Sequence, residues 1–395
     1  MEAYMSERAA VGPGADTPTH LISAAVVGSG AGAPVIVPAP IHPASAVTSW
    51  KNPSTCDIAA LKSVLHADRK RWRTVTVGLA ALACALMVVM MSVGNTVYSP
   101  AEVWRVLMGG DAPDNTLRSI WEYRLPRVVA ALLVGFAFGI AGNTFQTMLR
   151  NPLASPDVIG ITSGSSVATV FCLLVLHMGA GETSAIALVA ALAVAAAIYG
   201  LSSIGGFSPG RLILVGLGAQ AMAKACTSFL LLKGAEFDVA SALRWLSGSL
   251  NGVTMQEVAP LVAVIPLAVL TLLFGKRLRV LELGTETATT LGASPRTTCT
   301  ALMLCTVAMI ALGTAVTGPI ACVTFLAGPI ATRLVGSSSR ATVPAGLVAV
   351  VLIMAADVVG QHFLGTRFPV GVVTGIMGTP YLLYLLVQMN KKGSM

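Results

Sequence analysis

Residues Thr74–Gly94 read TVTVGLAALACALMVVMMSVG and contain no charged side chain. A helix needs ~20 predominantly apolar residues to cross the hydrocarbon core of a bilayer, and this stretch meets that length. Because the bilayer core holds no water to satisfy backbone N–H and C=O groups, a spanning segment of this kind has to be helical. Thr74–Gly94 therefore predicts an α-helical protein of the membrane.

Nine more apolar stretches of similar length follow the first. They cover residues 128–149, 158–178, 184–203, 212–232, 258–275, 299–317, 319–335, 343–363 and 371–389. The AVILMFWYC residues make up 55% of the chain, charged residues only 11%, and the mean hydropathy is +0.80, whereas soluble domains carry about 25% charged residues. This composition excludes both a soluble globule and a disordered chain. We therefore predict an all-α, polytopic bundle of about ten transmembrane helices.

The segment before the first span has a different composition. Residues 1–73 are rich in Gly, Ala, Pro and Ser, and prolines recur along them, which is typical of a flexible segment. The apolar piece Leu21–Ile41 is similar to a secretory signal peptide, but it contains three prolines and has no basic residues immediately before it. We predict a flexible cytoplasmic tail over residues 1–73, a ten-span transmembrane domain over 74–390, and a short C-terminal tail over 391–395.

The distribution of basic residues predicts the orientation, because loops rich in Lys and Arg stay in the cytoplasm. With the amino terminus inside, 17 of the 25 Lys and Arg residues lie in inner segments and 7 in outer segments, while the acidic residues outside the spans divide equally, 8 and 8. The positive excess thus faces the cytoplasm, and an even number of spans places both termini there. The net charge of +8 then needs no nucleic-acid partner.

Two charged residues, Lys224 and Asp357, fall inside predicted spans. Each costs ~2.5–3.5 kcal/mol near the centre of a helix on insertion scales, so an intramembrane charge is a candidate functional residue. Both spans run outward, and counting residues from the start of each span places the two side chains within about 3 Å in depth. Two interpretations stay open: a structural ion pair between them, or a water-exposed cation at Lys224 that attracts an anionic ligand.

Little in the chain points to an enzyme. The 7 cysteines form no C-x-x-C pair and the 5 histidines show no ligand spacing, so we predict no metal site. No nucleophile and base are clustered, so we predict no catalytic residue. The phosphate-loop pattern G-x-x-x-x-G-K-[ST] is absent from the sequence, which removes the usual means of cradling ATP.

Four segments are unlike simple packing helices. Arg124–Arg127 (RLPR) places two guanidinium groups at the outer mouth of the second span, for contact with carboxylates of a soluble partner or for snorkelling to the interface. Arg150–Pro156 (RNPLASP) is a rigid inner turn, because its prolines forbid a continuous helix. Trp245–Leu250 (WLSGSL) puts an aromatic anchor and small residues at the outer face. The inner loop 276–296 fits a short amphipathic helix that offers a docking surface.

In order and spacing, these segments resemble the FecCD family of bacterial ABC-importer permeases, which take up iron-siderophores, cobalamin and haem. The resemblance rests on RLPR, Gly135, Gln146, RNPLA, Gly160, Ser163-Gly164, Trp245, Gly248-Ser249, the Glu282–Gly292 loop, Gly318-Pro319-Ile320, Ala356-Asp357 and Phe368–Gly371. It covers roughly residues 74–390 and leaves the first 73 residues outside. Each motif is weak by itself, but the ordered set is highly specific.

The resemblance implies a permease bundle of the type II importer class in the bacterial cytoplasmic membrane. Its partners would be a second permease, with a heterodimer favoured, two cytoplasmic ATPases that bind ATP and Mg²⁺, an extracytoplasmic binding protein, and lipid. The permease would bind no cofactor, and ferric iron would travel with the substrate.

By position in the family, the resemblance also assigns site residues. Arg124 and Arg127 would meet the binding protein, and Asn151 and Leu153 would belong to the inner gate. The loop Leu281–Arg296 would dock in the ATPase cleft through Leu281, Glu282, Gly284, Ala288, Leu291 and Gly292.

The chain departs from the family pattern at two places. Ile330 follows Pro329 where the family often has histidine, and Gln361 stands where members often carry a basic residue, a role that nearby Arg367 is placed to fill. The resemblance favours a ferric siderophore as substrate, with cobalamin or haem as the alternative. An ion-coupled secondary transporter with Lys224 and Asp357 as its ion site is the competing class, and the inner docking loop argues against it.

Overall fold

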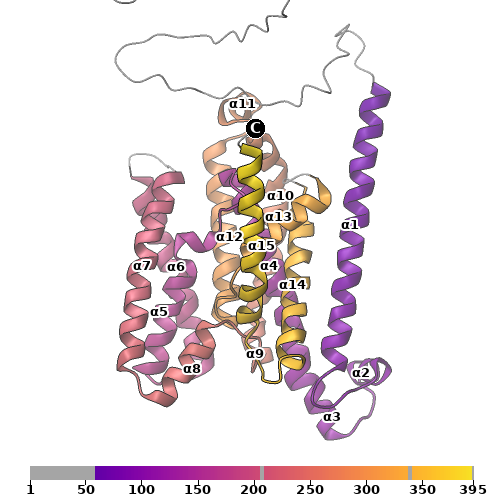
Figure 1. Ribbon diagram of the computed structural model, residues 1–395, viewed down its shortest axis with the longest axis vertical. Coiled ribbons are helices and arrows are strands. Elements are labelled where there is room, and N and C mark those ends of the chain that lie inside the picture. The colour runs from indigo at the N-terminus through magenta and orange to yellow at the C-terminus, as the bar shows by residue number, and fades with distance from the viewer. Residues whose placement is uncertain (1–57, 205–208, 337–339, 394–395) are drawn as a thin grey trace, which may run out of the picture. The chain divides into compact units, whose positions relative to one another are not determined.

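The computed structural model describes residues 58–204, 209–336 and 340–393 (Figure 1). Throughout these ranges the regular structure is helical. The elements are α1 (Ile58–Ser92), α2 (Pro100–Leu107), α3 (Asp114–Arg118), the π-helix η2 (Ser119–Arg124), α4 (Leu125–Leu149), the 3₁₀-helix η3 (Pro156–Ile159), α5 (Ile161–Leu174), α6 (Ala180–Ser203), α7 (Pro209–Lys233), α8 (Glu236–Leu246), α9 (Met255–Val258), the 3₁₀-helix η4 (Ala259–Ala263), α10 (Val264–Glu282), α11 (Thr285–Thr290), α12 (Pro295–Thr317), α13 (Val323–Val335), α14 (Thr342–His362) and α15 (Val370–Gly393).

The helices confirm the predicted all-α polytopic membrane fold. By length and composition, 7 segments of the described chain are helical and apolar enough to cross a membrane, and 3 shorter apolar helices, Ile161–Leu174, Val323–Val335 and Val370–Leu385, occupy other predicted spans. Every one of the ten predicted stretches coincides with a helix. The local signal, apolar length, therefore located the apolar helices correctly.

The first helix is longer than the predicted span. It begins at Ile58, so residues 58–73 are helical although we placed them in the flexible tail; residues 1–57 lie outside the described part of the chain. Residues 58–73 contain no proline or glycine, so nothing in them interrupts a helix. Arg71 donates hydrogen bonds of 2.7 and 2.9 Å to carbonyls at the C-terminal end of α13, and Trp72 donates one of 2.8 Å to the Arg340 carbonyl.

Helix α4 lies at the centre of the packing and contacts α10, α12, α13 and α14. Glycines on α4 allow this, because a Cβ at Gly135 would lie 2.7 Å from the Val350 Cα and one at Gly139 would lie 2.7 Å from the Gly346 Cα. A Cβ at Gly142 would overlap the backbone of Thr324. Close backbone approach through small residues is the usual basis of helix association in membranes, so these glycines serve packing.

The transmembrane helices define two ends, which are visible in Figure 1. Helices α2, α3, α8 and α9 lie at one end, called here the α2 end, and α11 lies with the C-terminal part of α15 at the other, called the α11 end. Helices α5, α6, α7 and α8 group on one side of the bundle and α1 stands on the opposite side (Figure 1). The two ends each carry a cleft, and these clefts contain six of the twelve candidate site residues: Arg124, Arg127 and Asp357 at the α2 end, and Asn151, Leu153 and Glu282 at the α11 end.

Candidate functional site

The cleft at the α2 end has a volume of about 880 Å³. Its charged side chains are Glu122, Arg124, Arg127, Arg244, Asp357 and Arg367. They come from η2, α4, α8, α14 and the segment before α15, which are distant in the sequence. Arginine is in excess over carboxylate in this set, which favours negatively charged partners or ligands at this end.

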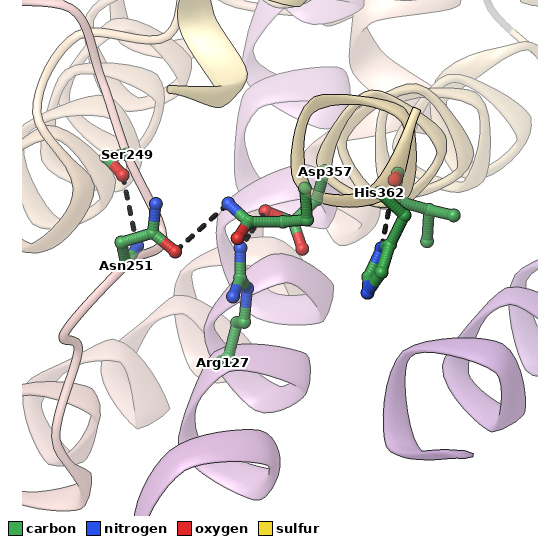
Figure 2. A network of polar contacts seen from close by, with 7 residues as sticks. Arg127, Ser249, Asn251, Asp357 and His362 are labelled. Atoms are coloured by element: carbon green, nitrogen blue, oxygen red, sulfur yellow. Dashed lines mark hydrogen bonds and ion pairs between the residues drawn. The ribbon is translucent and has the colours of Figure 1, made fainter. Parts of the chain in front are cut away.

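Arg127 and Asp357 form a largely buried ion pair in this cleft (Figure 2). The Arg127 Nη2 lies 2.6 Å from the Asp357 Oδ1, and the two side chains are 22% and 4% exposed. The structure therefore gives Asp357 a different partner from Lys224, which is exposed on α7. The depth argument placed Lys224 and Asp357 at one level, but it contains no information on which way each helix turns its side chain.

Polar side chains extend this pair across the cleft. Gln361 Nε2 donates a hydrogen bond of 3.1 Å to Asn251 Oδ1, and the Asn251 backbone N–H donates one of 3.1 Å to Ser249 Oγ (Figure 2). Arg367 Nη2 donates one of 2.7 Å to Asn95 Oδ1 while its residue stays exposed. Gln361 thus joins α14 to the segment after α8, and the same cleft holds the exposed cations Arg244 and Arg367.

Arg124 is held inside the α2 end. It ends η2, just before Pro126 of α4, and π-helical turns of this kind occur frequently at functional sites. Its guanidinium donates hydrogen bonds of 2.6 Å to the Met91 and Thr96 carbonyls and lies 4.5 Å from the centre of the Tyr98 ring. Hydrogen bonds with Thr96 and then Ser119 lower the pKa of Tyr98, and the Arg124 charge adds to this effect. Arg124 thus ties the connection after α1 to the start of α4.

Three glycines bring together motifs that are far apart in the sequence. Gly248 and Gly318 adopt φ angles of +67° and +70°, which L side chains rarely adopt, and a Cβ on either would overlap a carbonyl of the other's segment. The Gly371 N–H donates a hydrogen bond of 3.0 Å to the Gly248 carbonyl, and the Ser249 N–H donates one of 2.8 Å to the Thr317 carbonyl. The segments around Gly248, Gly318 and Gly371 therefore form one tight crossing.

The cleft at the α11 end has a volume of about 500 Å³. Its lining includes Asn143, Gln146, Arg150, Asn151, Leu153, Glu282, Pro329 and Arg333, so the predicted gate residues and part of the predicted docking loop share one cavity. The Asn151 Oδ1 accepts a hydrogen bond of 2.9 Å from the Leu153 N–H, an Asx turn that holds the two residues in one unit.

Helix α4 ends at this cleft in a Schellman motif. The Asn151 N–H donates to the Gln146 carbonyl at 3.0 Å and the Arg150 N–H donates to the Thr147 carbonyl at 3.3 Å. Arg150 has φ +51° and ψ +32°, at the position where glycine is usual. A left-handed conformation costs a residue with a side chain about 1–2 kcal/mol. The Arg150 Nη2 donates a hydrogen bond of 2.5 Å to the Leu281 carbonyl at the end of α10.

Pro329 explains a second contact of α4. Proline has no N–H, so the carbonyl four residues earlier loses its intrahelical partner, and in α13 that carbonyl belongs to Phe325. Gln146 Nε2 of α4 donates a hydrogen bond of 3.0 Å to it. A Cβ at Gly328 would overlap the Gln146 Oε1, so the Gly328-Pro329 pair provides both the acceptor and the space for Gln146.

The predicted docking loop, residues 276–296, contains the end of α10, the short helix α11 and the start of α12. The Leu281 and Ala288 side chains are 8% and 0% exposed, whereas Leu283 and Leu291 are 65% and 63% exposed. Gly284 and Gly292 have φ angles of +115° and +78°, which glycine adopts without strain, and they bound α11. A short helix, α11, is therefore present in this loop, and the exposed Leu283 and Leu291 flank it.

Some contacts near the gate had no signal in the sequence. Asp157 Oδ2 accepts hydrogen bonds of 3.2 Å from Ser155 Oγ and from Thr324 Oγ1, which lies on α13. Proximity of residues 167 positions apart leaves no local pattern.

Within the described ranges, no group of three or more His, Cys, Asp or Glu residues is arranged to hold a metal ion.

Comparison with known proteins places these features in one family. The model of the FecCD transport family matches residues 81–388. The ferric enterobactin transport system permease protein FepG of Escherichia coli (strain K12) is 35% identical over 76% of this chain and 91% of its own. The achromobactin transport system permease protein CbrC of Dickeya dadantii (strain 3937) is 38% identical over 79% and 92%.

A solved structure supports the same fold. An inward-facing metal-chelate type ABC transporter superposes with a TM-score of 0.70 over 80% of this chain and 99% of the other, at 21% identity. At this identity the likeness is one of fold alone.

Proposed function

Because the chain belongs to the FecCD transport family and is therefore the permease subunit of a bacterial ABC importer, with its ATPase on a separate subunit, we propose that its substrate is a ferric siderophore. The observation that carries the substrate class is the set of relatives at 31–38% identity, whose names specify ferric enterobactin, achromobactin, iron(3+)-hydroxamate and Fe(3+) dicitrate. The chain covers 91–97% of these relatives. Cobalamin and haem are the alternative substrates.

We place the α2 end outside the cell and the α11 end in the cytoplasm. The excess of basic residues in segments at the α11 end supports this orientation, because basic loops stay cytoplasmic. Both termini then lie inside. In this orientation the 880 Å³ cleft faces the binding protein.

At the outer face, the arginines supply positive potential toward acidic residues of the binding protein. Arg124 and Arg127 hold the framework of this surface through their internal contacts, and the exposed Arg367 makes the direct approach. Complementary charge raises the rate of such an encounter and sets its register.

At the inner face, Asn151 and Leu153 form the gate and α11 docks in the ATPase. The exposed Leu283 and Leu291 fit an apolar pocket of that subunit. ATP binding between two ATPases moves α11, and the motion opens or closes the gate, as alternating access requires two states with different contacts. The partner permease completes the path, with a heterodimer favoured.

Transport by the purified complex tests the proposal. The permease is isolated from its host with its co-purifying subunits, placed in liposomes, and offered binding protein loaded with radioactive ferric siderophore. We expect uptake to require ATP on the ATPase side. An excess of unlabelled ferric siderophore should reduce the uptake of the radioactive substrate, whereas cobalamin and haem should not. ATP-dependent uptake of cobalamin or haem without uptake of the ferric chelate would overturn the substrate assignment.

A further inference from the structure

The C-terminal turn of α4 carries an unusual residue for its backbone conformation. The position that follows a helix in a Schellman motif takes a left-handed conformation and is usually glycine, yet here it is Arg150 with φ +51°. Strained residues of this kind persist where the surrounding structure holds them, and they cluster at functional elements.

Its guanidinium reaches another helix. The Arg150 Nη2 donates a hydrogen bond of 2.5 Å to the carbonyl of Leu281, which lies in the last turn of α10. Carbonyls there lack an i+4 partner within the helix and carry the partial negative charge of the helix dipole. The Leu281 carbonyl accepts the Gly284 N–H at 3.2 Å, and its second lone pair leaves room for the guanidinium, a well-suited donor. The Leu281 side chain is only 8% exposed, which fixes the position of its carbonyl.

The two residues of this contact each precede an element with a proposed role in transport. Leu281 precedes Gly284 and α11, the helix proposed to dock in the ATPase. Arg150 precedes Asn151 and Leu153, the proposed gate residues, which an internal hydrogen bond holds together. The contact between residues 150 and 281 is thus a direct connection from the docking loop to the gate turn.

We propose that Arg150 is a strut that transmits movement of the docking loop to the inner gate. The Gln146–Phe325 hydrogen bond, one turn earlier on α4, holds the helix against α13 and is the pivot about which the turn moves. Arg150 is therefore a positioning residue that acts through Asn151 and Leu153. This proposal rests on the docking role proposed above for α11.

The test uses Arg150→Gly in the complete importer. Glycine suits the left-handed backbone, so this substitution keeps the turn while removing the strut. Arg150→Lys is the conservative variant, because lysine retains a charged donor with a shorter reach. Arg69→Met is the matched control, since it removes an exposed arginine on α1 outside the gate and the loop.

All proteins, including the parent, carry Pro152→Cys as a reporter in the gate turn. The measured quantity is the rate of maleimide addition at residue 152, followed by mass spectrometry with and without ATP and vanadate. We expect ATP to change this rate about fivefold or more in the parent and in Arg69→Met, as coupling free energies of usual size imply, but less than about twofold in Arg150→Gly. ATP hydrolysis should continue in Arg150→Gly while the substrate imported per ATP falls. Arg150→Lys should lie between the two.

The outcomes separate the strut from the functions on which it rests. A parental ATP response in Arg150→Gly would overturn the strut and leave the docking role intact, whereas a parent protein whose residue 152 ignores ATP would overturn both. If Arg150→Gly does not assemble, Arg150→Lys decides by the same comparison, and a parental response then overturns the strut. The labelling requires no transported substrate, so an error in the substrate class does not affect it.

Discussion

Breaking the Arg127–Asp357 pair on one side should destabilise the α2 end. At the observed 2.6 Å, an effective dielectric constant of ~20 gives an attraction of about 6 kcal/mol. Desolvation opposes part of this, and removal of one partner of a buried pair costs about 3–5 kcal/mol because the other charge stays buried. The Arg127 side chain is 22% exposed. We therefore expect a loss at the lower limit of this range, about 3 kcal/mol in the free energy of unfolding.

The assay is thermal unfolding of the purified complex, followed by intrinsic tryptophan fluorescence. At roughly 2 °C for each kcal/mol in a chain of this size, Asp357→Ala should lower the Tm by about 6 °C. The double variant Arg127→Met/Asp357→Leu should recover most of this loss, because apolar replacement of a buried pair is often neutral or stabilising.

Glu122→Ala is the control for the pair. It breaks the Arg118–Glu122 pair, whose side chains are 70% and 52% exposed, and exposed pairs contribute little, so the Tm should stay within about 1 °C of the parent value. The reasoning is refuted if Asp357→Ala unfolds at the parent temperature, or if the double variant loses as much stability as Asp357→Ala.

Three further substitutions test other parts of the structure. Gly139→Ala should destabilise the complex by about 1–3 kcal/mol, because the new Cβ meets the backbone of α14; Gly78→Ala, where no atom lies within 4 Å, should leave the Tm unchanged or raise it. Arg124→Met removes hydrogen bonds to two carbonyls and should increase hydrogen exchange over residues 93–98 while α15 exchanges at the parent rate. Leu291→Asp, at a side chain that is 63% exposed, should weaken binding of the ATPase subunits in pull-down without lowering the Tm of the permease. A parent Tm for Gly139→Ala, parent exchange for Arg124→Met, or full ATPase retention by Leu291→Asp would contradict the respective explanation.

Apolar length and composition, read from the sequence alone, were enough to predict the apolar helices of the bundle. Each predicted span coincides with a helix, because the bilayer imposes a length and a backbone hydrogen-bonding requirement that every spanning segment has to meet by itself. The family also followed from short motifs in order, and the family match over residues 81–388 confirms it. The start of α1 was predicted too late, since charged residues interrupt the apolar signal over residues 58–73 although nothing in them prevents a helix.

Side-chain partners were decided only by tertiary structure. Asp357 pairs with Arg127, 230 residues away, and not with Lys224, because residue counts give depth along a helix but not the direction in which its side chain points. Gly248, Gly318 and Gly371 were visible as separate motifs, and only the folded chain shows that they meet at one crossing.

The sequence by itself thus determined which segments form the apolar helices and which family the chain belongs to, since these properties depend on local hydropathy and on residues in order. The folded structure alone decided which helices face one another. It did so because contacts such as those of Arg150 with Leu281 and Gln146 with Phe325 depend on how helices rotate and cross, and that geometry results from packing of the whole bundle at once.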